Sequence, residues 1–325
     1  PVTAYRGAGR PEGNYYMERL IDTAAREMGI DPVELRRRNH IQPDQIPYKA
    51  ASGSTYDSGN FPAILDKALE LADWDGFAQR KAESARRGKL RGRGIGQFLE
   101  VTAPLQAEYG GVHFEADGGV KILTGSHDHG QGHGTTFGQI VATELGVPFD
   151  KIRLMQSDSD QLVSGTGTGG SKSLMSSGTA FVEASAKVIE KGRIIASHML
   201  EAGVEDIGFE AGRFTIAGTD RSISIMDMVQ KLNAGAGLPD DAPQSLDVDH
   251  VGSAGAATYP NGCHICEVEI DPETGITTVA RYSMVGDFGN LVNPVIVEGQ
   301  VQGGVVQGLG QCLMEETHYG ADGQL

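Results

Sequence analysis

Cysteine is scarce in this chain of 325 residues, which contains only Cys263, Cys266 and Cys312. Three thiols give no even disulfide framework and suit a reducing compartment. Cys263 and Cys266 have CxxC spacing, but the alternating pattern of residues 267–270 is typical of a strand. Positions three apart on a strand point to opposite faces, so we favour buried strand cysteines over a metal or redox pair.

Basic charge and long apolar runs are also missing. The formal net charge is −16, whereas nucleic acids and anionic membranes both require a basic face. No apolar run approaches the ~20 residues of a membrane span. The first residues have no initiator Met and neither the basic nor the apolar region of a signal peptide. We therefore expect a cytoplasmic protein without nucleic-acid or membrane-spanning contacts, in a chain whose two ends are cut from a longer one.

Glycine is the residue in excess. The chain has 46 glycines, about twice the usual share, and these predict tight turns and close approaches of the backbone to other backbone or to a ligand. The hydrophobic content of 39% is enough for a buried core. The length allows two domains or one large irregular domain.

Residues 1–93 have a mainly helical pattern. Apolar residues recur every three or four positions from 17 to 28, which predicts one helix that stops at Gly29. Asp31 is placed as the N-cap of a second, short helix. Residues 62–87 predict a third.

From residue 94 to 325 strands, glycine-rich loops and helices alternate. One hairpin is expected to turn at residues 116–119 and another at 271–275. Each hairpin leads to a glycine-rich loop and a helix, which gives two hairpin–loop–helix units. Residues 204–250 are mixed and acidic, and we expect a surface excursion there. This order predicts an α+β fold with mixed, antiparallel-rich sheets and packed helices.

The helices that follow the loops have clear start signals. One is expected at about residues 135–145, and a long one runs to about residue 203. A further helix starts at Pro294 with Asn293 as its cap. Glycines spaced by about four residues along it predict close helix packing.

The stretch HDHGQGHG, residues 127–134, raises the question of a metal site. His129 and His133 have the i, i+4 spacing of two ligands on a helix, but Gly130 and Gly132 disfavour a helix there. A flexible loop is also a poor support for a catalytic metal. The alternatives are a backbone cradle for a larger ligand, and a loop in which Asp128 and the histidines bond only to their own backbone.

A second glycine-rich loop, GTGTGG at residues 165–170, formally matches GxGxxG. A dinucleotide site needs a strand leading directly into the loop and an acidic residue at the end of the next strand, about twenty positions later. Here residues 157–164 come between the strand and the loop, and Glu190 lies inside an expected helix. Ser171 before Lys172 breaks the P-loop pattern. Exposed N–H groups and hydroxyls where a helix begins still favour anion binding. With Gln131 and the cation Arg6 in a third loop, AYRGAGR, these loops suit a large anionic heterocyclic cofactor.

Four stretches resemble, in order and over nearly the whole chain, the molybdenum-binding large subunit of the xanthine dehydrogenase, aldehyde oxidase and aerobic carbon monoxide dehydrogenase family. They are AYRGAGRPEG, TGSHDHGQGHGTTFGQIVA, GTGTGGSKS and GDFGNLVNPVIVEGQVQGGVVQGLGQ. The resemblance implies that the loops enclose a molybdopterin cytosine dinucleotide. It also implies that the pterin holds the molybdenum, so that no histidine is a metal ligand.

The resemblance assigns roles to individual residues. Arg6 is the arginine that approaches the molybdenum centre, and the cofactor contacts are Gly130, Gln131, Gly170, Ser171, Ser173 and Gln300. The segment 101–104 corresponds to a wall of the substrate pocket, which implies Val101 and Thr102 as pocket residues together with Ala8.

The sequence departs from the family at four points. Carbon monoxide oxidisers have a cysteine where this chain has Gly7, and xanthine oxidisers have a phenylalanine where it has Ala8. The GxGE segment that carries the general base is missing, as is the family's N-terminal portion. The resemblance therefore implies a fragment or split piece of the large subunit, inactive by itself.

The expected activity of the complete enzyme is hydroxylation of an aldehyde or N-heteroaromatic carbon with oxygen from water. Electrons would pass to 2Fe-2S clusters and FAD on an iron–sulfur subunit and an FAD subunit. The family implies a multi-subunit oxidoreductase, in which this chain joins the remainder of the large subunit in a dimer of heterotrimers. The alternatives are a non-catalytic paralogue or assembly subunit that keeps the cradle without cofactor, and a histidine-based metal hydrolase.

Overall fold

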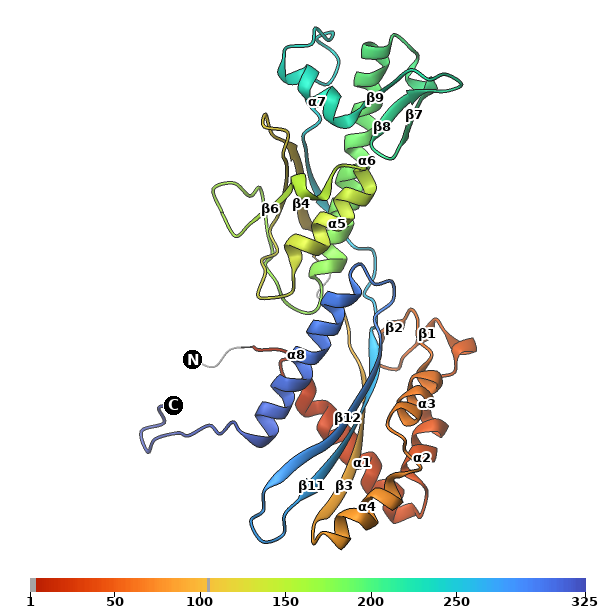
Figure 1. Cartoon of the computed structure of the whole chain (residues 1–325), viewed down its shortest axis with the longest axis vertical. Coiled ribbons are helices and arrows are strands. Elements are labelled where there is room, and N and C mark those ends of the chain that lie inside the picture. Colours follow the sequence, from red (N-terminus) through yellow and green to blue (C-terminus); the bar gives the residue numbers. More distant parts are fainter. Residues whose placement is uncertain (1–3, 104–105) are drawn as a thin grey trace. The chain divides into compact units, whose positions relative to one another are not determined.

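The computed structural model describes residues 4–103 and 106–325, and its contacts divide the chain into two compact units (Figure 1). Unit 1 contains Pro1–Val101, Thr258–Asn290 and Gln302–Leu325, and unit 2 contains Thr102–Ala257 and Leu291–Val301. The boundary expected from the sequence, between segments 1–93 and 94–325, marks the change from a mainly helical pattern to one with strands. The two compact units are divided differently, because each combines segments that are distant in the sequence.

The elements confirm an α+β fold with antiparallel-rich sheets. The helices are α1 (Arg10–Met28), α2 (Pro32–Asn39), α3 (Phe61–Leu71), α4 (Phe77–Arg86), α5 (His133–Leu145), α6 (Ser173–Leu200), α7 (Ile225–Asn233) and α8 (Pro294–Leu313). The strands are β1 (Tyr48–Lys49), β2 (Thr55–Tyr56), β3 (Leu90–Leu99), β4 (Glu108–Phe114), β5 (Val120–Thr124), β6 (Ile152–Gln156), β7 (Ile207–Glu210), β8 (Arg213–Ile216), β9 (Ser222–Ser224), β10 (Val248–Gly252), β11 (Asn261–Ile270) and β12 (Thr277–Asp287). Among the described residues, no helix is long and apolar enough to cross a membrane.

Unit 1 is built on a three-stranded antiparallel sheet in the order β12-β11-β3. The helices α1, α3 and α4 pack against this sheet. Leu65 and Ala68 of α3 are fully buried against Ile95, Cys263 and Ile265 of the strands. Burial of these apolar side chains holds the helical layer on the sheet.

The strand assignment of the CxxC segment is confirmed. Cys263 and Cys266 both lie on β11, three positions apart and therefore on opposite faces. Cys263 is fully buried in the core, whereas Cys266 is half-buried. Burial raises the pKa of the Cys263 thiol to about 12.

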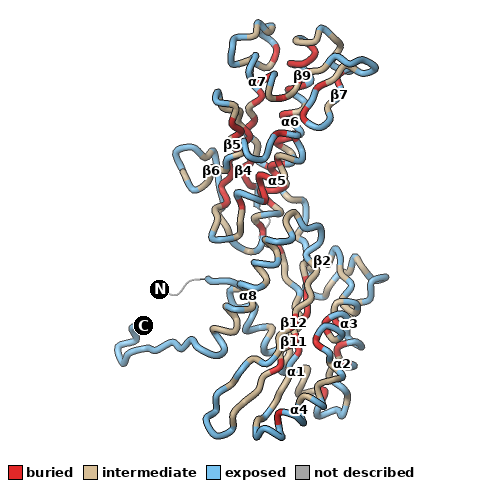
Figure 2. The backbone as a smooth tube through the Cα atoms, viewed as in Figure 1, coloured by how far each residue is buried: buried red, intermediate tan, exposed pale blue. Residues whose placement is uncertain are grey.

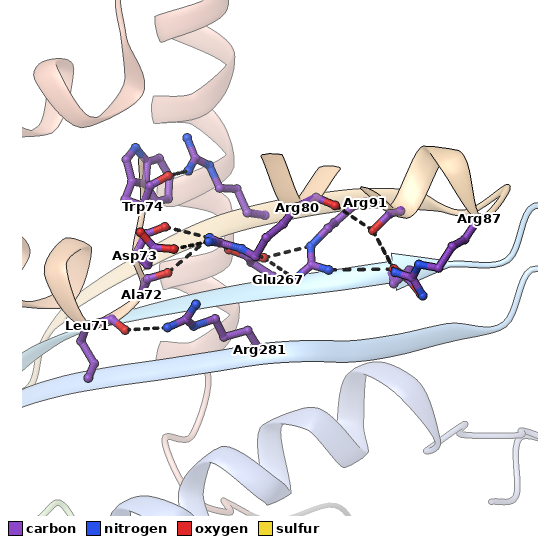
Figure 3. Close-up of polar contacts among 12 residues, drawn as sticks. Leu71, Ala72, Asp73, Trp74, Arg80, Arg87, Arg91, Glu267 and Arg281 are labelled. Carbon is purple, nitrogen blue, oxygen red and sulfur yellow. Dashed lines mark hydrogen bonds and ion pairs between the residues drawn. The ribbon is translucent and has the colours of Figure 1, made fainter. Parts of the chain in front are cut away.

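An ion cluster joins α4 to the sheet of unit 1 (Figure 3). Its centre is Glu267 on β11, which is 1% exposed. The Arg80 guanidinium donates to this carboxylate at 2.5 and 3.1 Å, and that of Arg91 donates at 2.6 and 3.0 Å. Burial acts to raise the pKa of Glu267, but the hydrogen bonds from Arg80 and Arg91 outweigh it and lower the pKa.

The single helix expected over residues 62–87 is wrong, because the structure has two helices with a break between them. Asp73 in the break has a left-handed φ of 47°, which interrupts the α-helical hydrogen bonding. The turn lets Trp74 stack on the Arg93 guanidinium, whose carbon lies 3.2 Å from the ring centroid. Arg93 is on β3, so a tertiary contact fixes the break.

Helix α1 ends as expected, with Gly29 at a left-handed φ of 66°. Its apolar stripe, however, is mostly uncovered within this chain. Ala25 is buried, but Met17, Leu20 and Met28 are 58, 62 and 62% exposed. In Figure 2, exposed residues such as these are drawn in pale blue.

Unit 2 is built on the four-stranded sheet β10-β4-β5-β6, in which β5 and β6 are parallel and the other neighbours antiparallel. Helices α5 and α6 pack on it and on each other. Phe137 of α5 and Phe181 of α6 are fully buried, with ring centroids 5.3 Å apart. Figure 2 shows these two helices and the adjoining strands as the most buried part of the unit.

The expected surface excursion at residues 204–250 is wrong. It forms the small sheet β7-β8-β9 and helix α7, which share a core with α6. Phe214 is fully buried there, and a Cβ at Gly192 of α6 would lie 2.1 Å from its ring. The acidic composition of the segment suggested a surface position, but its few apolar residues are buried and pack the segment against α6.

Candidate functional site

The carboxylate of Asp128 organises the first glycine-rich loop of unit 2. Its Oδ1 accepts the backbone N–H of Gly130 at 2.7 Å and that of Gln131 at 2.6 Å, and its Oδ2 accepts that of His133 at 2.8 Å. Gly130 and Gly132 have φ values of 106° and 75°, which other residues rarely adopt. One side chain therefore closes the loop onto the first residue of α5.

Hydrogen bonding keeps Asp128 ionised. Burial acts to raise its pKa, but the backbone N–H groups of Gly130, His133 and Gln131 outweigh this effect, so the pKa lies below its ordinary value. The carbonyl oxygen of the Gln131 side chain accepts the N–H of His129. This bond orients the Gln131 amide within the loop.

The three histidines of this loop have different environments. His133 is 4% exposed and its ring packs on Phe137 at 4.7 Å, so burial lowers its pKa. The rings of His127 and His129 meet edge to face at 4.5 Å. Across residues 4–103 and 106–325, no group of three His, Cys, Asp or Glu side chains is arranged to hold a metal ion.

The second glycine-rich loop lies directly against the first. The Thr168 hydroxyl donates to the carbonyl oxygen of His127 at 2.6 Å and accepts the His127 N–H at 3.2 Å. The two backbones touch at Gly125 and Gly165, where a Cβ on Gly125 would lie 2.1 Å from the Gly165 Cα. Neither glycine can carry a side chain without separating the loops.

The predicted contacts of the second loop lie where it enters α6. Gly170 and Ser171 have left-handed φ values of 63° and 59°. Ser173 is the first residue of α6, and its hydroxyl lies 3.1 Å from that of Thr168. The 28-residue helix thus begins within the paired loops, where its N–H groups favour an anion.

Helix α8 brings Gln300 to the first loop. The Gln300 amide nitrogen donates to the Gly130 carbonyl oxygen at 2.9 Å. Asn293 caps α8 as expected, because its Oδ1 accepts the N–H of Ile296 at 3.0 Å. Among the sequence-predicted cofactor contacts, Gln300 therefore meets the loop of Gly130 and Gln131, and Gly170, Ser171 and Ser173 lie where the paired second loop enters α6.

Arg6 belongs to unit 1 and precedes α1 in a turn of left-handed residues, Gly7, Ala8 and Gly9. Its guanidinium lies against α8, where a Cβ on Gly303 or Gly304 would be 3.6 or 3.9 Å from it. The glycines of α8 were expected to allow close helix packing. Two of them instead face an arginine side chain.

The residues expected at the substrate pocket are divided between the units. Ala8 is exposed in unit 1, and Val101 is half-buried just after β3. Thr102, in unit 2, is 7% exposed, and its hydroxyl lies 3.2 Å from the Met175 sulfur. Pro104, in the same expected segment, lies outside the described residues.

A polar group beneath the loops was missed by the sequence analysis. Glu108 at the start of β4 and Lys172 at the end of the second loop are 0 and 3% exposed. The Thr166 hydroxyl contacts both side chains. A charged residue at a buried position of a strand was the available signal, since such residues are rarely buried without a partner.

Comparison with known proteins shows sequence similarity to molybdopterin-binding proteins along the chain. Residues 67–325 and 1–40 match molybdopterin cofactor-binding domains. Subunit gamma of the 6-hydroxypseudooxynicotine dehydrogenase complex of Paenarthrobacter nicotinovorans is 33% identical over 100% of this chain and 41% of its own length. The carbon monoxide dehydrogenase large chain of Afipia carboxidovorans is 33% identical over 99% of this chain and 42% of its own length.

A solved structure is also closely similar. Quinoline 2-oxidoreductase from Pseudomonas putida 86 superposes with a TM-score of 0.89 and 33% identity, covering 100% of this chain and 43% of its own. The chain thus spans about two fifths of the length of these relatives.

Proposed function

This chain belongs to the molybdopterin-binding large-subunit family of the molybdenum hydroxylases, and on that premise we propose that its paired glycine-rich loops enclose a molybdopterin cytosine dinucleotide. The observation that carries the proposal is that Gln300 contacts Gly130 in the first loop, and that this loop is paired at His127 with Thr168 of the loop leading into α6. The donors there are backbone N–H groups, side-chain amides and hydroxyls. These suit a pterin with phosphates and require no metal ligand from the protein.

The open backbone of the loops fits a large ligand. Among the described residues, nothing lies within 4 Å of a Cβ built at Gly130, Gly134 or Gly169, so this part of the chain leaves the space at these positions open. Within the loops Gln131 and Gln300 are proposed to contact the pterin. Gly170, Ser171 and Ser173 are proposed to contact the phosphates and the pterin, and Arg6 to approach the metal centre.

When bound, the cofactor supplies the redox chemistry by which oxygen from water is added to a substrate carbon and two electrons leave it. The residues of this chain bind and orient the reacting groups. The Gln131 amide offers both donors and an acceptor, and Arg6 offers a fixed positive charge. The family's general base has no counterpart in these 325 residues, so we expect the chain alone to be inactive.

The proposed substrate class is an aldehyde or an N-heteroaromatic ring. Gly7 leaves no thiol at the position where carbon monoxide oxidisers use one, and Ala8 offers no aromatic ring against a purine. Relatives named for nicotine and quinoline support a ring substrate. Ala8, Val101 and Thr102 are the proposed pocket residues.

The proposed assembly is a cytoplasmic complex with an iron–sulfur subunit carrying 2Fe-2S clusters, an FAD subunit and the remainder of the large subunit, as a dimer of heterotrimers. Relatives named as a complex subunit, a large chain and a large subunit support partners of this kind. Exposed apolar residues also support them, because Leu20 of α1 and Val306 of α8 are 62 and 68% exposed.

The test is metal and nucleotide analysis of the complete large subunit purified with its co-expressed neighbours. We expect about one molybdenum and, after acid hydrolysis, one cytidine monophosphate per subunit. A folded complex without either would favour the non-catalytic paralogue. Stoichiometric zinc without pterin would favour a histidine-bound metal site.

A further inference from the structure

A buried carboxylate lies beneath the paired loops. Glu108, the first residue of β4, is 0% exposed. Its Oε1 accepts the N–H of Tyr109 at 2.9 Å, and its Oε2 accepts the Thr166 hydroxyl at 2.8 Å. A carboxylate removed from water is costly unless several donors or a cation compensate its charge.

The compensating cation is Lys172, although the two charges do not touch. Lys172 is 3% exposed, and its Nζ donates to the Thr166 Oγ1 at 2.6 Å and to the Gln106 Oε1 at 2.7 Å. A hydroxyl has one proton to donate and can accept at the same time. Thr166 therefore accepts from Lys172 and donates to Glu108, which links the two charges through one oxygen.

The same carboxylate is connected to the first loop by a chain of buried hydroxyls. The Ser126 hydroxyl lies 3.5 Å from the Glu108 Oε2 and 3.0 Å from that of Ser177 on α6. The Ser177 hydroxyl in turn accepts that of Thr124 at 3.0 Å. Ser126 directly precedes the first loop, and Thr166 is in the second loop, so Glu108 is bonded to the base of one loop and to the other loop itself.

The inward orientation of Lys172 is informative. A lysine between serines at the start of a helix would ordinarily be expected to meet a phosphate. Here its ammonium is buried and engaged by Gln106 and Thr166. Its role is therefore to be sought in the support of the loops.

We propose that Glu108, Thr166 and Lys172 form a positioning network that holds the two glycine-rich loops at a fixed separation before any ligand binds. The loops touch otherwise through Gly125, Gly165 and the Thr168 bonds, which allow close approach but carry no charge. The identity of the ligand that the two loops enclose depends on the proposed function, whereas the network itself does not. Preorganisation of this kind lowers the ordering cost of binding.

Amide hydrogen exchange of residues 126–133 and 164–172 tests the network in the complete large subunit, first without cofactor. Lys172→Met leaves the carboxylate uncompensated, and Glu108→Gln leaves the ammonium uncompensated. We expect each to speed exchange of both loops by about tenfold or more, from the usual strength of a hydrogen bond to a charged group. The matched control is Lys187→Met on α6. Lys187 is exposed and its Nζ contacts the Nδ1 of His250, so this variant should leave the loops unchanged.

The double variant Glu108→Gln with Lys172→Met distinguishes a network from two separate effects. Because it removes both charges together, we expect its exchange to be much slower than the product of the single effects predicts. Thr166 is itself exposed, so the Thr166→Val variant should fold normally. Because it lacks the bridging hydroxyl, its two loops should exchange faster than those of the wild type, whereas Thr166→Ser, which keeps a hydroxyl, should exchange at the wild-type rate. Strictly multiplicative single effects, or a Thr166→Val variant identical to wild type, would overturn the proposal.

The rate at which the loaded complex loses its pterin is measured in the same variants. Faster loss in Lys172→Met and Thr166→Val, but not in Lys187→Met, is the expected result. If the wild-type complex never contains pterin, the proposed function falls, while the exchange data still decide whether the network holds the loops. If the wild-type complex contains pterin and the Thr166→Val variant shows unchanged hydrogen exchange in both loops, the proposed network is wrong and the proposed function stands.

Discussion

The side-chain amide nitrogen of Gln300 lies 2.9 Å from the carbonyl oxygen of Gly130 and donates a hydrogen bond to it. The two residues are 170 positions apart, and Gly130 has a φ of 106°. The bond fixes the peptide that precedes Gln131. An amide from α8 thus orients the loop in which the Gln131 side chain is proposed to meet the cofactor.

In the complete enzyme, Gln131→Ala should reduce turnover per bound molybdenum by about 10²–10³, because it removes a polar contact aimed at the reacting centre. Cys263→Ser and Cys266→Ser should retain turnover, since these thiols lie on β11 of unit 1. Cys263→Ser should cost mainly stability, about 1–3 kcal/mol. Loss of turnover in both serine variants with activity kept in Gln131→Ala would refute the assignment.

Asp128→Ala should open the first loop, because the N–H groups of Gly130, Gln131 and His133 lose a charged acceptor worth about 1.5–3 kcal/mol per bond. Hydrogen exchange of residues 130–133 should accelerate at least tenfold, and the exposed Asp150→Ala should have no such effect. The pKa of Asp128 is lowered by folding. Its contribution is therefore complete above the unfolded pKa of about 3.9 and is lost as the pH falls through the lower folded pKa. Loop exchange in the wild type that is insensitive to acid would contradict this account.

Glu267→Gln should lower the free energy of unfolding by about 3 kcal/mol, because it leaves Arg80 and Arg91 without their buried counter-charge. Glu70→Gln, which breaks the exposed pair with Lys67, should stay within about 0.5 kcal/mol. Denaturant melts of both variants make the comparison. Equal effects would mean that the cluster in Figure 3 does not stabilise the contact of α4 with the sheet.

Alkylation at pH 8 should modify the exposed Cys312 rapidly and leave Cys263 unmodified until the protein unfolds, as mass spectrometry of the labelled peptides can measure. Because folding raises the pKa of Cys263 to about 12, the protonated thiol favours the folded state. This contribution is complete below the unfolded pKa of about 8.5 and is lost as the pH rises toward 12. Labelling of Cys263 as fast as Cys312 would disprove its burial.

Residues 1–325 produced alone should purify without molybdenum, since the chain spans about two fifths of the length of its relatives. Much of the surface that encloses the cofactor in the complete subunit is then expected to lie outside it. Elemental analysis of the purified protein is the measurement. One molybdenum per chain would show that the described loops suffice.

Local signals predicted the local structure well. Asp31 and Asn293 cap the helices expected of them, and the turns at 116–119 and 271–275 close the hairpins β4-β5 and β11-β12. These features depend on neighbouring residues, so a short stretch of sequence determines them.

Features that depend on distant partners could not be predicted. The break between α3 and α4 depends on Arg93, which approaches Trp74 from a strand. The Glu108 network depends on Thr166, 58 positions away. For the candidate site, the resemblance identified the two loops, but their pairing through Thr168 and His127 required the structure.

The sheet of unit 1 also has a consequence for the growing chain on the ribosome. Its central strand, β11, pairs Asn261 with Leu99 of β3, so the first hundred residues lack their partner strand until about 160 more have been made. At synthesis rates of about 5–20 residues per second this delay is roughly 8–30 s. During that time Leu65 and Ile95 remain accessible to chaperones and proteases, whereas the four-stranded sheet of unit 2 and its helices α5, α6 and α7 all lie within the one segment Thr102–Ala257 and can fold as it emerges.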